Sequence, residues 1–221
     1  MPKATKKTTV HALFIGIDKY NENVTLEQGL MFPELGGCVA DVTDVRDALK
    51  LDTSLNIKET MLLDSDATKD NIVKEIQTLM GKAKKKDAVL IYYSGHGTVE
   101  VADKSIWTSE TDNRLEGIVC HYNHPDTGKF ILADKEWRYL LNQLWVKTQA
   151  HIVTIFDCCH SGDNTRSTVQ KLDPLSKLSV RERKVDFVFS QRKWSDFVFA
   201  NDIPASAFVG KRAEDVIPEG Q

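Results

Sequence analysis

Residues 151–162 read HIVTIFDCCHSG, an apolar run that ends at Asp157 and leads directly into two adjacent cysteines, a histidine and a Ser-Gly pair. The run is short and rich in β-branched residues, which is typical of a strand buried in a sheet. The polar residues follow at its carboxyl end, where parallel α/β sheets carry their functional side chains. The stretch therefore predicts a core strand with chemically useful groups at its end.

Similar apolar runs occur earlier in the chain, separated by segments with helical periodicity. Strands are expected at 10–17, 57–63, 87–93 and 151–156, with a shorter one at 118–120, and helices at 39–51, 68–82 and from 134 to about 144. Strands that alternate with helices imply right-handed crossovers and a mainly parallel sheet. The 221 residues are therefore expected to form one α/β domain.

Composition excludes several classes of protein. The 29 Lys and Arg against 32 Asp and Glu leave a net charge of −3, so nucleic acid is not an expected partner. No apolar run approaches the roughly 20 residues that cross a bilayer, and no signal-peptide core follows the polar start, so we expect no membrane contact and a cytoplasmic location. Four unevenly spaced cysteines favour free thiols in a reducing compartment.

Two residues at strand ends form a candidate catalytic pair. His96 lies in YSGHG at 93–97, directly after the strand at 87–93, and Cys159 lies in the opening stretch. A thiol is a useful nucleophile only as thiolate, and a nearby imidazole favours that form and can later protonate a leaving amine. Each residue alone has a plainer explanation, an inert buried thiol and a loop histidine bonded to backbone. Together, at two strand ends and among glycines, they favour a Cys-His dyad.

The same two stretches resemble a known family. YSGHG at 93–97 and DCCHSG at 157–162 are similar to the two catalytic blocks of metacaspases, relatives of the caspases within the caspase–hemoglobinase fold. The resemblance covers about residues 10–165, and further similar segments are LFIGI at 13–17, GCVAD at 37–41, Ala67-Thr68 and Asn71-Ile72. It implies a caspase-like three-layer α/β/α sandwich and a cysteine endopeptidase.

The resemblance also assigns catalytic roles. It makes Cys159 the nucleophile and His96 the acid/base partner, whereas the adjacent His160 does not match the family's histidine. The oxyanion of the tetrahedral intermediate needs preorganised donors, and the backbone N–H groups of Gly97 and Cys159 are the candidates.

Substrate preference follows from the same resemblance. Metacaspases cleave after Arg or Lys, and a basic side chain in a pocket needs carboxylates because an unpaired buried charge is costly. The matching pocket residues are Asp41, Ser94 and Asp157. For Asp41, the sequence alone equally allows the role of a helix N-cap or of an acid in the first helical turn.

Calcium is the cofactor that the resemblance implies, as an activator rather than a participant in the chemistry. Asp112 and Asp134 are the expected ligands, with Glu116 nearby. Position 133 is Ala where the family has a second Asp, and Arg166 stands near the place of another acid. A site that wants six to eight oxygen ligands is weakened by both changes.

The expected organisation has three parts: a flexible basic tail at 1–9, the catalytic large-subunit domain at 10–165, and a weakly ordered linker and C-terminal segment at 166–221. No convincing strand pair follows Ala200, so the family's small-subunit region is expected to be absent. Polypeptide substrates and a small-subunit fragment are the expected partners. Self-cleavage is expected in the last segment, which offers Arg166, Lys171, Arg183, Lys184 and Arg192.

Two other hypotheses stay open. Without a small subunit, the chain could be a catalytically incomplete, caspase-like scaffold or regulatory protein. A zinc site could be built from Cys120, His121, Cys158, Cys159 and His160. Structural zinc sites usually use separated Cys pairs, which adjacent cysteines at a strand end fit poorly.

Overall fold

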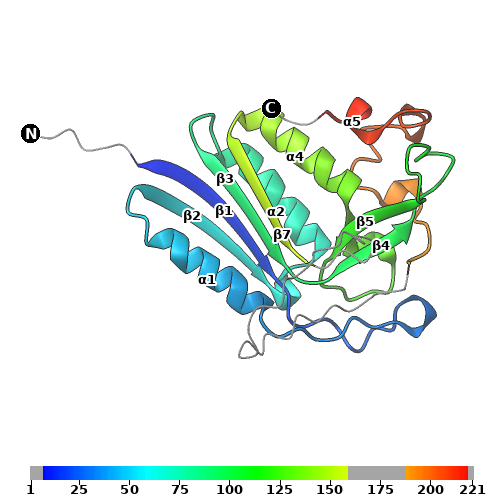
Figure 1. Ribbon diagram of the computed structural model, residues 1–221, viewed down its shortest axis with the longest axis horizontal. Helices are drawn as coiled ribbons and strands as arrows, with labels where there is room; N and C mark the ends of the chain where they lie inside the picture. The colour runs from blue at the N-terminus through cyan, green and yellow to red at the C-terminus, as the bar shows by residue number, and fades with distance from the viewer. Residues whose placement is uncertain (1–6, 159–187, 219–221) are drawn as a thin grey trace, which may run out of the picture.

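A computed structural model describes residues 7–158 and 188–218. Its centre is a four-stranded parallel sheet in the order β2-β1-β3-β7 (Figure 1). The strands are β1 Thr8–Gly16, β2 Leu55–Leu63, β3 Ala88–Ser94 and β7 His151–Asp157. The four apolar runs predicted as strands are therefore confirmed.

Helices cover both faces of this sheet. They are α1 Cys38–Lys50, α2 Lys69–Lys82 and α4 Asp134–Thr148. Figure 1 shows α1 on one side of the sheet and α2 with α4 on the other. Successive residues of β1 serve the two sides: Phe14 packs with Val42 of α1, whereas Ile15 packs in the cluster that contains Ile72 of α2. The predicted three-layer α/β/α sandwich is confirmed.

A smaller antiparallel sheet follows β3 and holds the turn around His96. Its strands are β4 Gly97–Val101, β5 Arg114–Val119 and β6 Ile131–Ala133, in that order, with the one-turn helix α3 Thr127–Phe130 directly before β6. β5 includes part of the strand expected at 118–120, whereas β4 and β6 were not predicted. Where the sheet meets the end of β3, the N–H of Val119 donates to the carbonyl oxygen of His96 at 2.9 Å.

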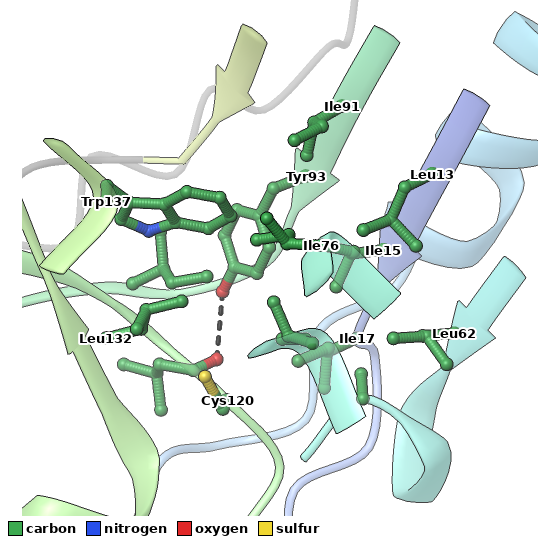
Figure 2. Packing of buried hydrophobic residues seen from close by; sticks show 14 of the residues in the cluster. Leu13, Ile15, Ile17, Leu62, Ile76, Ile91, Tyr93, Cys120, Leu132 and Trp137 are labelled. Atoms are coloured by element: carbon green, nitrogen blue, oxygen red, sulfur yellow. Dashed lines mark hydrogen bonds between the residues drawn. The ribbon is translucent and has the colours of Figure 1, made fainter. Parts of the chain in front are cut away.

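The main core lies between the large sheet, α2 and α4. In Figure 2, Tyr93 of β3 lies beside Trp137 of α4, and its hydroxyl reaches the backbone next to Cys120. On the opposite face, α1 approaches the sheet very closely at Gly16, where a Cβ would lie 2.8 Å from Cγ2 of Val42. This close approach brings the start of α1 to the carboxyl edge of the sheet.

Residues 188–218 differ from the weakly ordered segment predicted there. They contain the one-turn helix α5 Ala213–Val216 and two short 3-10 turns, and Phe189, Phe199 and Phe208 are all fully buried. The physical reason is an aromatic cluster that Phe199 and Phe208 form with Trp107, which no periodic pattern in the sequence announces. Of the predicted basic tail, Thr8 and Thr9 already belong to β1, and the predicted linker residues 166–187 lie outside the described residues.

Across residues 7–158 and 188–218, no helix combines the length and the apolar character that crossing a membrane requires.

Candidate active site

The predicted site residues gather where three strands of the large sheet end together. Ser94 ends β3 and pairs in register with Gly16 of β1 on one side and with Asp157 of β7 on the other. His96 and Gly97 follow two and three residues after Ser94. The structure therefore brings the expected base and the expected pocket residues to one edge, as the rule for parallel sheets predicts.

The backbone of His96 is fixed on both sides. Its N–H donates to the hydroxyl of Tyr20 at 3.0 Å, and its carbonyl oxygen accepts from the hydroxyl of Tyr93 at 2.8 Å. Gly95 makes the tight turn possible, since a Cβ there would lie 2.5 Å from the Tyr93 hydroxyl oxygen. Burial raises the pKa of the Tyr20 and Tyr93 hydroxyls far above their ordinary range, so both stay protonated and can keep these hydrogen bonds.

The imidazole of His96 is positioned by the loop between β1 and α1. Its Nε2 atom lies 2.9 Å from the carbonyl oxygen of Pro33, and the rings of Tyr20 and Phe32 pack against it with centroids 5.0 and 5.2 Å away. A carbonyl oxygen can only accept, so Nε2 carries the hydrogen and Nδ1 is the basic nitrogen of the neutral ring. No sequence pattern marks Tyr20, Phe32 or Pro33 as part of the site.

Asp41 lies in the first turn of α1, and its carboxylate faces the strand ends. Ser94 donates its hydroxyl to Oδ2 of Asp41 at 3.4 Å. The capping role belongs to Asp18 instead, whose carboxylate accepts from the N–H groups of Gly37 at 3.0 Å and Cys38 at 2.8 Å. Of the readings left open from sequence, Asp41 is thus a first-turn acid, and that position is compatible with a pocket role.

Asp157 contributes a second exposed carboxylate on the other side of Ser94. The hydroxyl of Tyr92 donates to its Oδ2 at 3.2 Å. Burial, followed by the charge of Asp157, raises the pKa of Tyr92 to about 12, so this donor stays protonated. Two carboxylates therefore flank one buried serine at the end of the sheet.

A third group at this edge, Cys38, was not singled out from sequence. Burial raises the pKa of its thiol to about 11, with nearby Asp18 and Asp41 adding to the shift. The thiol is therefore neutral at physiological pH and is a weak nucleophile.

The candidate oxyanion donors are only partly described. Gly97 is buried and begins β4, paired with Ile118. Cys159, the expected nucleophile and second donor, lies outside the described residues. Cys158, directly before it, is half-buried.

The expected calcium ligands do not form a metal site among the described residues. The carboxylate of Asp134 pairs with the ammonium of Lys135 at 2.7 Å, and the same ammonium pairs with Glu110 at 2.7 Å. Asp112 instead accepts the N–H of Arg114 within its own turn at 3.1 Å. Residues 7–158 and 188–218 hold no group of three or more His, Cys, Asp or Glu suited to a metal ion. The residues present thus do not fit calcium at Asp134.

The residues of the alternative zinc site that the structure describes do not form a metal site either. Cys120 lies in the main core, and burial raises its pKa to about 12, so it stays a thiol (Figure 2). Neither Cys120, His121 nor Cys158 belongs to a metal-binding group within the part of the chain that the structure describes. Cys159 and His160 lie outside it.

A comparison with known protein families shows which family the chain belongs to. The model of the metacaspase peptidase C14 domain matches residues 10–166, which include both YSGHG at 93–97 and DCCHSG at 157–162. The chain belongs to the metacaspase family. The resemblance seen at 93–97 and 157–162 is therefore confirmed.

Individual metacaspases are similar over the same region. Metacaspase-3 of Trypanosoma cruzi is 32% identical over 162 residues, covering 70% of this chain and 40% of that protein. Metacaspase-2 of Trypanosoma brucei brucei is 32% identical over 163 residues, covering 70% of this chain and 42% of its own length. Metacaspase-1A of Aspergillus oryzae is 27% identical over 161 residues, 70% of this chain and 35% of the relative. The chain thus spans about two fifths of the curated relatives it matches.

A solved structure supports the fold alone. Protein GSU0716 from Geobacter sulfurreducens superimposes with a TM-score of 0.51 and 22% identity, over 68% of this chain and 50% of that one.

Proposed function

We propose that this chain is a cysteine endopeptidase that hydrolyses peptide bonds after Arg or Lys, with Cys159 as nucleophile and His96 as acid and base. The observation that supports it most is the orientation of His96, whose Nε2 is engaged by Pro33 so that Nδ1 is left as the basic nitrogen. Membership of the metacaspase family, with His96 and Cys159 in the two matched blocks, supports the same assignment.

In the proposed mechanism, Nδ1 of neutral His96 takes the thiol proton of Cys159, and the thiolate attacks the carbonyl carbon of the scissile bond. The N–H groups of Gly97 and Cys159 receive the developing oxyanion. The imidazolium then gives its proton to the leaving amine, which departs and leaves a thioester. A water molecule, deprotonated by His96, hydrolyses the thioester and restores the thiol when the imidazolium returns its proton.

The preference for basic residues is proposed from the pair of carboxylates that flanks Ser94. Asp41 and Asp157 are both exposed at the sheet edge, so an arginine or lysine side chain entering between them would meet two negative charges. Guanidinium pairs with carboxylates through charge-assisted hydrogen bonds, which are about twice as strong as neutral ones.

The test is hydrolysis of short fluorogenic peptides with Arg, Lys or Asp before the reporter group. Cleavage after Arg and Lys but not Asp is expected, with Cys159→Ala and His96→Ala inactive. Activity that survives Cys159→Ala would overturn the assignment of the nucleophile. Cleavage after Asp would overturn the proposed pocket.

A second candidate, a catalytic unit that needs a small-subunit fragment, is favoured by the surface of β7. Within the described residues β7 pairs only with β3, and Val153 and Ile155 are 38% and 43% exposed. Apolar side chains on an edge strand favour a further strand beside them. The chain should then cleave peptides poorly by itself and gain activity when coexpressed with the small-subunit region of a metacaspase. Full activity of the chain alone would reject this candidate.

Self-processing is proposed from the family resemblance, whereas the ion pairs of Asp134 and the turn contact of Asp112 do not support the calcium activation that the same resemblance implies. Among the basic residues expected as cleavage sites, Arg192 must be corrected, because its side chain is fully buried in ion pairs and is inaccessible in the folded chain. Arg166, Lys171, Arg183 and Lys184 lie outside the described residues. Mass spectrometry of the purified chain, compared with Cys159→Ala, tests self-cleavage at each of them.

A further inference from the structure

We propose that Phe189 and Ser190, which lie downstream of the candidate nucleophile, act as positioning residues for His96 by holding the loop that carries Phe32 and Pro33. This inference rests on the proposed function, since positioning matters only if His96 acts in catalysis. It concerns a part of the chain beyond residue 166, where the match to the family model ends.

The first step is that His96 depends on an irregular loop. Residues 17–37 connect β1 to α1 with only one short 3-10 turn, Glu27–Gly29, between them. Yet this loop supplies the carbonyl oxygen of Pro33 at 2.9 Å from Nε2 and the ring of Phe32 at 5.2 Å from the imidazole. A loop without regular hydrogen bonding needs outside contacts to keep such geometry.

Phe189 supplies one of those contacts. Its ring stacks on Phe32 with centroids 5.9 Å apart and an interplanar angle of 29°, and it packs edge-on against Phe130 at 5.5 Å. Its backbone extends the small sheet: the N–H of Phe189 donates to the carbonyl of Val99 at 2.9 Å, and the N–H of Val101 donates back to Phe189 at 2.8 Å. Phe189 thus joins the rigid β4 strand to the residue that covers His96.

Ser190 supplies the second contact. Its N–H donates to Oε2 of Glu27 at 2.9 Å, and its hydroxyl donates to the other oxygen of the same carboxylate. Glu27 begins the 3-10 turn of the loop. Phe189 and Ser190 therefore contact the loop at two points, one on the turn and one directly before Pro33.

The segment that makes these contacts is itself firmly anchored two residues later. Arg192 donates from Nε and Nη2 to the two oxygens of Glu100, each at 2.6 Å, and from Nη2 to Glu136 at 3.1 Å. Glu136 also pairs with Lys69 at 2.8 Å. All four side chains are at most 5% exposed, so the charges meet with little competition from water. An anchor of this kind can fix the position of Phe189 rather than merely fill space.

The segments directly before and after residues 159–187 therefore both contribute to the candidate active site. The β7 strand ends two residues before the candidate nucleophile, and Phe189 and Ser190 contact the loop that orients the base. Misplacing a catalytic group by about 1 Å can cost up to about 100-fold in rate. Loosening the Phe189 contact is therefore expected to lower kcat and leave KM nearly unchanged.

The experiment compares Phe189→Leu with Phe199→Leu in the full chain. Phe199 is equally buried but packs in the separate cluster around Trp107 and Trp194, whereas Phe32 and Phe189 both belong to the main core. Both variants lose the same ring and should lose similar thermal stability. Only Phe189→Leu is expected to lower kcat, by about tenfold. Glu27→Gln, a surface change that weakens the Ser190 contact, should act in the same direction by a smaller factor.

A readout that does not require activity separates this inference from the proposed function. In the Cys159→Ala background, the ¹⁵N chemical shifts of His96 report which ring nitrogen carries the hydrogen. A single Nε2–H tautomer is expected in the parent and in Phe199→Leu, and a mixture of tautomers in Phe189→Leu. If the parent cleaves no peptide, the proposed function fails while this test still stands. Identical His96 signals in both variants, or equal losses of kcat, would overturn the positioning role.

Discussion

The Nε2 atom of His96 lies 2.9 Å from the carbonyl oxygen of Pro33, in the loop between β1 and α1. A carbonyl fixes the tautomer of the imidazole without placing a full negative charge beside it. Through this contact the backbone of the loop orients the imidazole of the candidate dyad and makes Nδ1 its basic nitrogen.

His96→Gln should abolish peptidase activity while the chain stays folded. Glutamine can still donate to the Pro33 carbonyl, but it cannot accept the thiol proton, so kcat should fall at least about 1,000-fold. Steady-state cleavage of an Arg peptide measures the effect, and circular dichroism checks the fold. His151→Gln, at the exposed start of β7, is the control and should retain full activity. Substantial turnover by His96→Gln would remove His96 from the mechanism.

Asp157→Asn should weaken cleavage after Arg and Lys mainly through KM. The variant keeps the hydrogen bond with Tyr92 at 3.2 Å but removes one of the two charges beside Ser94. A charged hydrogen bond is worth about 1.5–3 kcal/mol, which corresponds to a factor of about 10 to 150 in KM. Asp41→Asn should act in the same direction.

Asp44→Asn is the matched control for both pocket variants. It makes the same charge change one turn further along α1, on an exposed side chain. Equal loss in Asp44→Asn and Asp157→Asn would show that net charge, rather than the pocket, controls the reaction.

Alkylation should distinguish the described thiols by their surroundings. Burial raises the pKa of Cys38 to about 11 and that of Cys120 to about 12, so both stay protonated at pH 7. Because only the thiolate reacts, labelling of Cys38 by iodoacetamide should be slow at pH 7 and should rise about tenfold per pH unit up to its pKa. Peptide mapping by mass spectrometry measures each site. Rapid modification of Cys38 at neutral pH would contradict its assignment as an inert neighbour of the pocket.

The strands of the large sheet were predictable from sequence because a parallel strand buried on both faces is almost continuously apolar. The run 151–156 shows this directly. β4 was not predicted because Glu100 interrupts its apolar pattern. The burial of Glu100 depends on its ion pair with Arg192, 92 positions away in the chain. The packing of residues 188–218 was not predicted for the same reason, because it depends on contacts with distant residues such as Trp107.

The candidate site was predictable only in part. His96, Ser94 and Asp157 could be placed because strand ends in a parallel sheet meet at one edge. Pro33 and Phe32 could not, since they lie on an irregular loop whose position is set by long-range contacts such as the one with Phe189. No local periodicity encodes such contacts.

Lys135 provides a prediction about calcium. Its ammonium already joins Asp134 to Glu110, so chelator or millimolar calcium should shift the melting temperature of the parent by less than about 1 °C. Lys135→Met leaves two acidic groups facing each other and should lower the melting temperature by about 2–4 °C. Calcium should then restore part of that loss. Differential scanning fluorimetry in EDTA and in CaCl₂ decides it, and a clear calcium stabilisation of the parent would reveal a site elsewhere in the chain.

Arg192→Met should destabilise the chain far more than loss of an exposed arginine. Arg192 pairs with Glu100 and Glu136 in the interior. Its removal leaves the Glu100 carboxylate buried without its cation, whereas Glu136 keeps Lys69, and an unpaired buried charge costs about 3–5 kcal/mol. The melting temperature should fall by about 10 °C. Arg212→Met, which breaks only the exposed pairs with Glu214 and Asp215, should change it by less than about 2 °C.

The double variant Arg192→Met/Glu100→Gln tests whether the loss of stability in Arg192→Met arises from the unpaired charge of Glu100. It removes one buried carboxylate together with its cation, so it should recover part of the stability lost in Arg192→Met alone. Additive losses in the double variant would mean that the two side chains stabilise the fold independently. Thermal and urea unfolding of the parent, the two single variants and the double variant complete this cycle. Because the ion pairs of Arg192 also anchor Phe189, the loss of stability in Arg192→Met should be accompanied by the mixture of His96 tautomers that is expected of Phe189→Leu.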